Sequence, residues 1–329
     1  MSENMIRVVF CSAALSFLLF PACDQAFDPQ QEFQPKLVVF SILSTDRESQ
    51  YVRVEKNYVM ATYDPATANA DLSVKDAVVE IRDEMSNRRF SDTTLVRPDS
   101  SRYIFPIWGY VLKDFQPVPG KTYRLSVRSL SLGQVEASLT IPTKPVIGFS
   151  AVATAVLDNP LTYSESDIVC SAVLSPTAKG FHSRLFVDYD VLVGSDWQEG
   201  RIEIPLEFAY PKLKSFDFVT YPRLTARPAR NQVGVSFLNE VYRAALNFVV
   251  DRRHKGRKLI FKWAVFHFMQ VEKNLFNYYF LTHAYRDTHS MRLDEPLYSN
   301  VTGGYGLVGA YTADSLVHLL PENFSYNVR

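Results

Sequence analysis

Short runs of alternating apolar and polar residues dominate the first half of the chain. The run at 121–129 places Tyr123, Leu125 and Val127 two residues apart, and 135–141 repeats this period after a loop that contains Gly133. Residues two apart in a strand face the same side of a sheet, so the period predicts half-buried strands. Runs of the same kind precede them at 37–43, 51–60, 76–83, 88–94 and 101–110. Strands this short, with turn signals between them, are typical of an immunoglobulin-like β-sandwich, predicted over residues 36–143.

A proline-rich break follows this first domain. Pro142 and Pro145 lie in a segment of five residues, and prolines so close together do not fit a central strand. We therefore predict a second, β-rich domain over residues 144–329. Its strand candidates are less regular and lie at 168–174, 183–193, 201–208, 232–237, 242–251 and 258–271. Between them, residues 209–231 are rich in Tyr, Pro and Arg and are predicted to form a long loop.

The hydrophobic period changes from two to that of a helix after residue 271. Leu275, Tyr279, Thr282 and Arg286 recur at helical spacing, which predicts one amphipathic helix over about 272–289. The predicted fold class is mainly β. It consists of an N-terminal immunoglobulin-like β-sandwich and a second, β-rich domain with one amphipathic helix near the C-terminus.

The N-terminus has the layout of an export signal. Arg7 precedes the apolar stretch Val8–Phe20, and the small residue Ala22 stands directly before Cys23. A basic flank, a short apolar core and a small residue at the end predict a signal peptide over residues 1–22. The end of this stretch resembles a bacterial lipoprotein signal, in which the Cys after the cut is acylated. Residues 23–35, polar with two prolines, would be the lipidated Cys23 and its tether.

The cysteines and the net charge argue against a disulfide in the mature chain and against a nucleic-acid partner. Cys11 would leave with the signal and Cys23 would carry lipid, so Cys170 remains as a buried structural thiol without a disulfide partner. Lys and Arg number 35 and Asp and Glu number 35, which gives a net charge of zero. A neutral chain gains little from releasing phosphate counterions, so the composition argues against a nucleic-acid partner.

Motif searches give no catalytic constellation, metal site or cofactor site. Residues 304–309 read G-x-G-x-x-G, but no βαβ pattern surrounds them, so we interpret them as a glycine-rich strand or bulge with close backbone packing. The six histidines lack zinc-site spacing. No G-x-S-x-G elbow is present. We therefore predict that the protein is not an enzyme.

Aromatic residues near prolines and in the predicted loop are the candidates for contact with a ligand or a partner. Large rings beside polar groups suit sugars or protein partners. The alternative is that these rings fill the cores of the two domains. The candidates are Trp108, Tyr110, Tyr210, Phe216, Phe218 and Tyr221.

Several segments together resemble a known family. They are 35–44, 74–83, 119–129 and 137–145 in the first domain, then 274–287 and 295–316, where P-x-Y-S-N-x-x-x-G-Y-G-L-x-G is the most specific element. This order resembles the Bacteroidota lipoproteins grouped as domain of unknown function 4249. The resemblance implies a structural role for a set of signature residues, which are Tyr279, Tyr298, Asn300, Gly304, Gly306 and Gly309.

The family also implies a location and partners. Its members look like lipid-anchored, palmitate-bearing proteins of the outer membrane, exposed on the cell surface and often encoded near TonB-dependent transporters. One hypothesis is an accessory subunit that captures a ligand, such as a glycan or a peptide, for such a transporter. The alternative is a stand-alone adhesin or structural envelope protein without a transporter partner.

Overall fold

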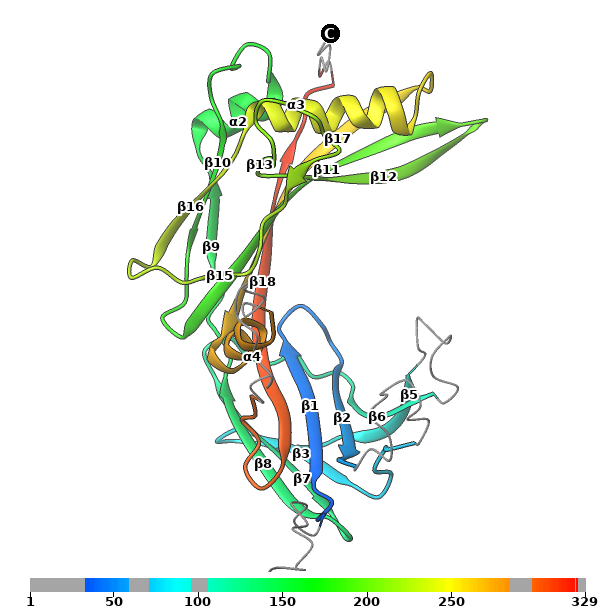
Figure 1. Ribbon diagram of the computed structural model, residues 1–329, viewed down its shortest axis with the longest axis vertical. Helices are drawn as coiled ribbons and strands as arrows, with labels where there is room; N and C mark the ends of the chain where they lie inside the picture. Colours follow the sequence, from blue (N-terminus) through cyan, green and yellow to red (C-terminus); the bar gives the residue numbers. More distant parts are fainter. Residues whose placement is uncertain (1–32, 59–70, 96–105, 284–297, 323, 325–329) are drawn as a thin grey trace, which may run out of the picture. The chain divides into compact units, whose positions relative to one another are not determined.

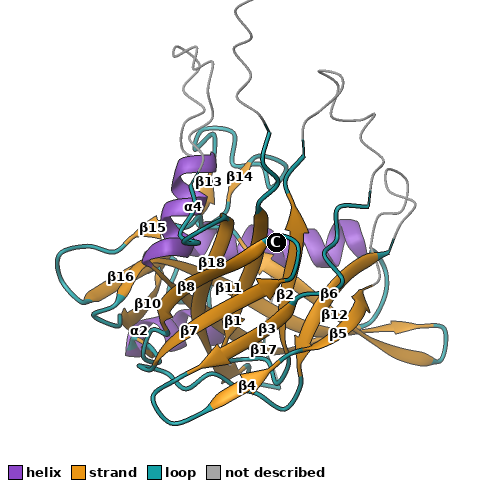
Figure 2. Ribbon diagram, turned by 90° about the horizontal axis from the view of Figure 1, so that it is seen from below, coloured by secondary structure: helices purple, strands orange, loops and turns teal. Residues whose placement is uncertain are grey.

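The computed structural model describes residues 33–58, 71–95, 106–283, 298–322 and 324, with the side chains of 281–283 left out. By its internal contacts the chain divides into two units, Met1–Pro35 and Lys36–Arg329. Strands greatly outnumber helices in the described part of the second unit (Figure 2), so the prediction of a mainly β fold is confirmed. The predicted signal peptide and Cys23 lie outside the described residues.

The largest sheet has nine strands, in the order β12-β11-β17-β18-β1-β2-β6-β5, with β15 pairing β11 outside this path. It combines strands from both sides of the predicted domain boundary. They are β1 (Leu37–Ser44), β2 (Gln50–Lys56), β5 (Ser91–Leu95), β6 (Ile107–Leu112), β11 (Ala178–Val193), β12 (Asp196–Ile204), β15 (Thr225–Ala226), β17 (Leu259–Glu272) and β18 (Tyr305–Leu319).

A second sheet closes the N-terminal sandwich. Its strands, in the order β4-β3-β7-β8, are β4 (Asn87–Arg89), β3 (Val78–Arg82), β7 (Thr122–Ser129) and β8 (Gly133–Thr140). Alternate residues of β7, among them Tyr123 and Leu125, are buried against β1 and β2, whose Val39 and Val54 face the same core. The period of two thus places one face of each sheet in a shared interior, which is the predicted β-sandwich.

Most of the rest of the unit packs around a second hydrophobic cluster, whereas Leu275 of the last helix packs in a smaller third cluster with Val271 and Leu307. This part of the unit contains a three-stranded sheet, a two-stranded sheet and helices, all after residue 145. Their bounds are β9 (Val146–Phe149), β10 (Ile168–Val173), β16 (Gln232–Phe237), β13 (Glu207–Phe208), β14 (Val219–Thr220), α2 (Ala151–Asp158), α3 (Asn239–Asn247), the π-helical η2 (Phe248–Arg253) and α4 (Lys273–His283). The boundary predicted at residues 143–144 separates most residues of the two clusters, but Val301, Val308 and Ala310 of the sandwich cluster come after it. The division into domains there stays a prediction.

Strand β18 links the two hydrophobic clusters. Its first half pairs in parallel with β1, from Tyr305 opposite Val38 onward, and its second half pairs antiparallel with β17, up to Leu319 opposite Trp263. Figure 1 shows this strand between β17 and β1. Val308 belongs to the cluster of the sandwich, whereas Leu320, directly after the strand, belongs to the second cluster. The C-terminal strand therefore completes a core that begins near residue 37.

The strand predicted at 242–251 is wrong, because this segment forms α3 and the start of η2. Tyr242, Ala245, Leu246 and Val249 are fully buried, at the spacing of one helical face. The aliphatic residues suggested a strand, but the two alanines and the period of 3.6 favour a helix.

The amphipathic helix predicted near the C-terminus is confirmed over Lys273–His283, and the predicted residues 284–289 lie outside the described part. Two further α-helices, α2 and α3, are present in the described part of the chain, so the expectation of a single helix was too low. Within the described ranges, none of the helices combines the length and the apolar character needed to cross a bilayer.

Candidate functional site

The outward face of the nine-stranded sheet carries a hollow over β11, β12, β17 and β18. Strand register aligns Arg201, Asp188, Trp263 and Leu319 across these four strands. The hollow has a volume of about 480 Å³, and we call it the sheet-face hollow. Its lining residues are Phe186, Asp188, Arg201, Trp263, Val265, His267, Ser315 and Val317.

A second hollow of about 300 Å³ adjoins the first and is called the adjoining hollow. The two share Asp188, Arg201 and Trp263, so these side chains form the wall between them. The remaining residues of the adjoining hollow are Tyr189, Asp190, Glu199, Gly200 and Lys262. Together the hollows give one continuous surface on rigid strands, which is a suitable support for binding.

Ion pairs hold the charged side chains of this face in place. Arg201 donates from Nε and Nη2 to the two carboxylate oxygens of Asp188, at 2.5 and 2.8 Å. Arg184 donates in the same bidentate way to Glu203, at 2.9 and 2.5 Å. These hydrogen bonds hold the pKa of both guanidinium groups above the usual range. Because each guanidinium group donates two hydrogen bonds to one carboxylate, its orientation is fixed.

The two arginines also stack on one aromatic ring. The guanidinium carbons of Arg184 and Arg201 lie 4.6 and 5.1 Å from the centre of the Phe186 ring. Phe186 projects from β11 between Glu203 of β12 and Val265 of β17. The result is a layer in which cations, carboxylates and an aromatic face are ordered before any ligand arrives.

A β-bulge sets the direction of Trp263. Asp188 pairs with Trp263, but Tyr189 pairs with Phe261, so Lys262 is an extra residue on β17. Phe261 and Ala264 are buried, whereas Lys262 is half-buried and Trp263 is 37% exposed. Without the extra residue, strict alternation would send one of these two adjacent side chains into the core. The bulge thus turns the indole to solvent, and the Lys262 ammonium lies over the ring, 5.4 Å from its centre.

His267 is the titratable group at the other end of the sheet-face hollow. Its Nδ1 lies 3.0 Å from the hydroxyl oxygen of Ser315 on β18. Burial first, and then the charge of Arg184, lower the pKa of His267 below its ordinary value. The neutral imidazole is therefore favoured at pH 7, and it acts there as a hydrogen-bonding group.

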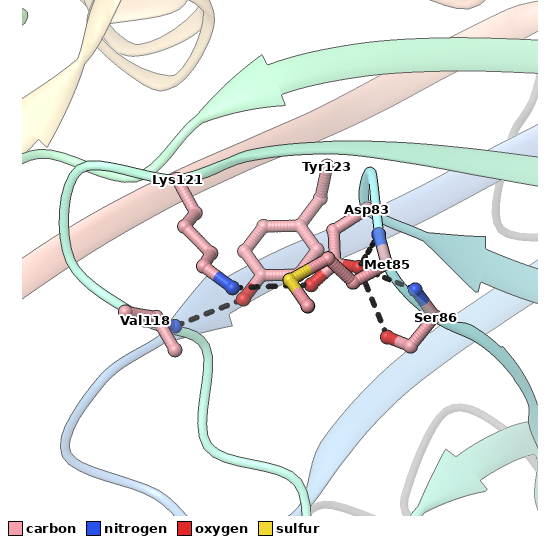
Figure 3. A network of polar contacts seen from close by, with 6 residues as sticks. All are labelled: Asp83, Met85, Ser86, Val118, Lys121 and Tyr123. Carbon is pink, nitrogen blue, oxygen red and sulfur yellow. Dashed lines mark hydrogen bonds and ion pairs between the residues drawn. The ribbon is translucent and has the colours of Figure 1, made fainter.

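The N-terminal sandwich has a larger hollow of about 700 Å³, at the turn between β3 and β4 and beside β7. Figure 3 shows its polar contacts. The Asp83 carboxylate accepts from the backbone N–H groups of Met85 and Ser86 at 2.9 and 2.7 Å, which holds the pKa of Asp83 below its usual value. The Tyr123 hydroxyl accepts from the N–H of Val118 at 3.0 Å. These contacts fix two turns, so this hollow offers less free polar chemistry than the sheet face.

Of the aromatic residues predicted to bind, Trp108 and Tyr110 lie in strand β6. Tyr110 is 3% exposed; its hydroxyl donates to the Val74 carbonyl at 2.7 Å and accepts from the Ala77 N–H at 3.1 Å. The Tyr110 ring therefore has no free face for a ligand. The alternative given above, that the ring fills the core, is correct for Tyr110. Trp108 packs against the same cluster, with Lys75 5.4 Å from its ring centre.

The other four aromatic candidates lie around the short hairpin of β13 and β14. Tyr210 and Phe218 are exposed and meet edge to face at 5.6 Å, and Tyr221 is also exposed. Phe216 packs on Phe248 at 4.9 Å, against the second hydrophobic cluster. None of the six predicted residues lines the sheet-face hollow or the adjoining hollow. Trp263 was missed because the bulge that exposes it leaves no signal in an apolar run.

The signature residues lie on α4, in β18 and in the segment directly before β18. The Asn300 amide donates to the Val308 carbonyl at 2.7 Å and accepts from the Val308 N–H at 2.9 Å, so it continues the sheet ladder beside β18. Tyr298 donates to the Asn274 side chain at 2.8 Å, and Tyr279 is half exposed on α4.

The glycines of the signature allow close packing. A Cβ on Gly304 would lie 2.4 Å from the Leu37 carbonyl oxygen, and one on Gly309 would lie 2.9 Å from the Cβ of Leu275. The glycine motif is thus a strand packed closely on a neighbouring backbone, as interpreted from the sequence. It holds α4 and β1 against β18.

Cys170 lies fully buried in β10 and forms no disulfide. Burial raises the pKa of the Cys170 thiol far above its usual range, so the thiolate is strongly disfavoured. Within the described ranges, no three His, Cys, Asp or Glu side chains come together as a metal site.

These observations define a mainly β protein in which a sandwich shares its largest sheet with a second β-rich part. Residues 24–170 match the family model of a domain of unknown function, DUF4249. The match confirms the resemblance to the DUF4249 family over this segment of the chain. The second group of resembling segments, 274–316, lies beyond the matched range.

The chain was also compared with solved structures and with curated proteins. The chain is similar to the crystal structure of chicken CNTN1 FN1–FN3 domains, at 11% sequence identity and a TM-score of 0.19. That similarity covers 86% of this chain and 63% of that chain, less than two thirds of its length. No curated protein matches the chain.

Proposed function

We propose that this protein is a lipid-anchored outer-membrane lipoprotein of the cell surface and captures a ligand for a TonB-dependent transporter. The anchor would be the acylated Cys23, and residues 24–35 would be the tether. Support for export comes from the apolar stretch before Cys23 with its basic flank. Two or more acyl chains on one cysteine would hold the protein firmly on the membrane.

The observation that carries a binding role is the sheet face around Trp263. Binding needs exposed aromatic surface and fixed polar groups, and both are present in the sheet-face hollow. The Ser315–His267 pair is the nearest thing there to hydrolytic machinery. Among the described residues, however, no carboxylate hydrogen-bonds to His267 to orient it as a general base. We therefore favour ligand capture, without a cofactor, over catalysis.

The test is a gentle extraction of the tagged full chain from outer membranes, followed by mass spectrometry of what co-purifies. Near-equimolar recovery of a TonB-dependent barrel is the expected result. Recovery of the lipoprotein alone would contradict the accessory role and favour a stand-alone adhesin or structural envelope protein.

The anchor is tested separately with Cys23→Ala. The wild-type protein should take up labelled palmitate and be cleaved by protease on intact cells. The variant should lose the label and leave the outer-membrane fraction. Normal membrane attachment and uptake with Cys23→Ala would contradict the proposed lipid anchor.

A further inference from the structure

We propose that the sheet-face hollow and the adjoining hollow bind a neutral oligosaccharide, which stacks on the indole of Trp263. This inference rests on the proposed ligand-capture function and names the class of ligand. It concerns a surface that neither the family match nor the aromatic pattern of the sequence assigns.

The first argument is the exposed indole. A large aromatic ring normally gains free energy by burial, yet the bulge at Lys262 turns Trp263 outward at a place where the opposite orientation would bury it. Bulges that redirect a side chain are enriched beside functional sites. Sugar rings present weakly positive C–H groups on one face, and these complement the negative face of an aromatic ring.

The second argument is charge. Beside Trp263, Arg201 is paired with Asp188, and Lys262 is paired with Asp190 at 3.1 Å. A charged ligand gains little net attraction here, because each of these charged groups is already neutralised by its partner. A neutral polyol needs no uncompensated charge, and it can use the acceptor positions that the paired carboxylates retain and the N–H donors that the guanidinium and ammonium groups retain. Hydroxyl groups use both, so the paired ions suit a neutral sugar.

The third argument is the shape of the surface. The two hollows lie on either side of the wall made by Asp188, Arg201 and Trp263, with volumes of about 480 and 300 Å³. Val317, which is 57% exposed, adds apolar surface at the rim on β18. A ligand that fills both hollows has to cross the indole, which fits a chain of linked rings better than one monosaccharide.

The experiment is calorimetric titration of the full-length lipoprotein, purified in a detergent without a sugar headgroup. The probes are neutral hexasaccharides of α-1,4-glucose, β-1,4-glucose, β-1,4-xylose and β-1,4-mannose, and one anionic oligogalacturonate. Binding of at least one neutral probe is expected, weakened roughly tenfold or more by Trp263→Ala, since a central aromatic contact is removed.

Two further variants keep the test interpretable. Trp197→Ala removes a second exposed tryptophan, which lies in β12 and lines neither hollow. This variant should leave the affinity unchanged. Val317→Arg places bulk in the hollow from an exposed position, so it should weaken binding without unfolding the protein. If Trp263→Ala loses binding only because it misfolds, Trp197→Ala and Val317→Arg should both bind like the wild type.

Three results would overturn the inference. They are no binding of any neutral hexasaccharide, preferential binding of the oligogalacturonate, and unchanged affinity in both Trp263→Ala and Val317→Arg. The titration does not involve a transporter. Sugar binding without a co-purifying barrel would therefore contradict only the accessory role, and a barrel without sugar binding would contradict only this inference.

Discussion

Gly306 of β18 lies so close to Val39 of β1 that a Cβ at position 306 would be 1.9 Å from the Val39 carbonyl oxygen. Gly306 also has a φ of +121°, a backbone conformation that L side chains rarely adopt. The parallel pairing that joins the last strand to the first therefore depends on the missing side chain. It gives the glycine motif a physical role in the sheet.

We predict that Gly306→Ala destabilises the protein by about 2 kcal/mol or more, because backbone strain and overpacking add at one position. Denaturant unfolding followed by circular dichroism measures the change. Gly234→Ala is the matched control, since Gly234 also lies in a strand but has open space around its Cα. Equal stability of the two variants would contradict the close-packing explanation.

A second prediction concerns Glu272, which caps α4 from the end of β17. Its carboxylate, 4% exposed, accepts from the N–H groups of Asn274 and Leu275 at 2.7 Å each. Glu272→Ala should cost about 1 kcal/mol by loss of this cap. Glu272→Gln keeps an acceptor oxygen and should cost less, as measured by thermal unfolding.

Glu272 also predicts a pH dependence. Burial raises its pKa in the folded protein, despite the backbone hydrogen bonds that lower it. Its contribution to stability is therefore complete below the unfolded pKa and is lost as pH rises through the higher folded pKa. As the pH rises through this folded pKa, the wild type should therefore lose unfolding free energy relative to Glu272→Gln. A difference independent of pH would contradict the prediction.

Tyr110 provides a third prediction, about the sandwich core. Tyr110→Phe removes a hydroxyl that bonds two backbone groups, Val74 C=O and Ala77 N–H, and leaves both without that partner. We expect a loss of about 1–3 kcal/mol in thermal or denaturant unfolding. Tyr210→Phe, at an exposed ring, should have little effect. A neutral Tyr110→Phe would show that water replaces the hydroxyl.

The fourth prediction is the reactivity of Cys170. Because the thiol is buried in β10 and its pKa is raised, it should not react with a thiol reagent in the native state and should react fully in denaturant. Mass spectrometry of modified peptides identifies the site. Labelling of native Cys170 at the rate of an unfolded thiol would show that β10 opens readily.

The amino-acid sequence alone determined the elements in which local pattern and packing agree. The alternation in β7 and β8, the helical spacing that begins α4 and the close-packed glycines were all predictable, because each is fixed by neighbours along the chain or by the absence of a side chain. The segment at α3 was mistaken for a strand, since its aliphatic residues satisfy both periods over a short window.

Tertiary structure decided what depends on partners distant in sequence. Residues Tyr305–Leu319 form a long strand only because β1 and β17 supply its hydrogen bonds. In the pairing with β1, Tyr305 and Val38 are 267 positions apart in the sequence (305 minus 38). Tyr110 became a core residue through Val74 and Ala77. Trp263 reached the surface because one extra residue, Lys262, shifts β17 against β11. Register of this kind is set between strands, and a single chain segment carries no local signal of it.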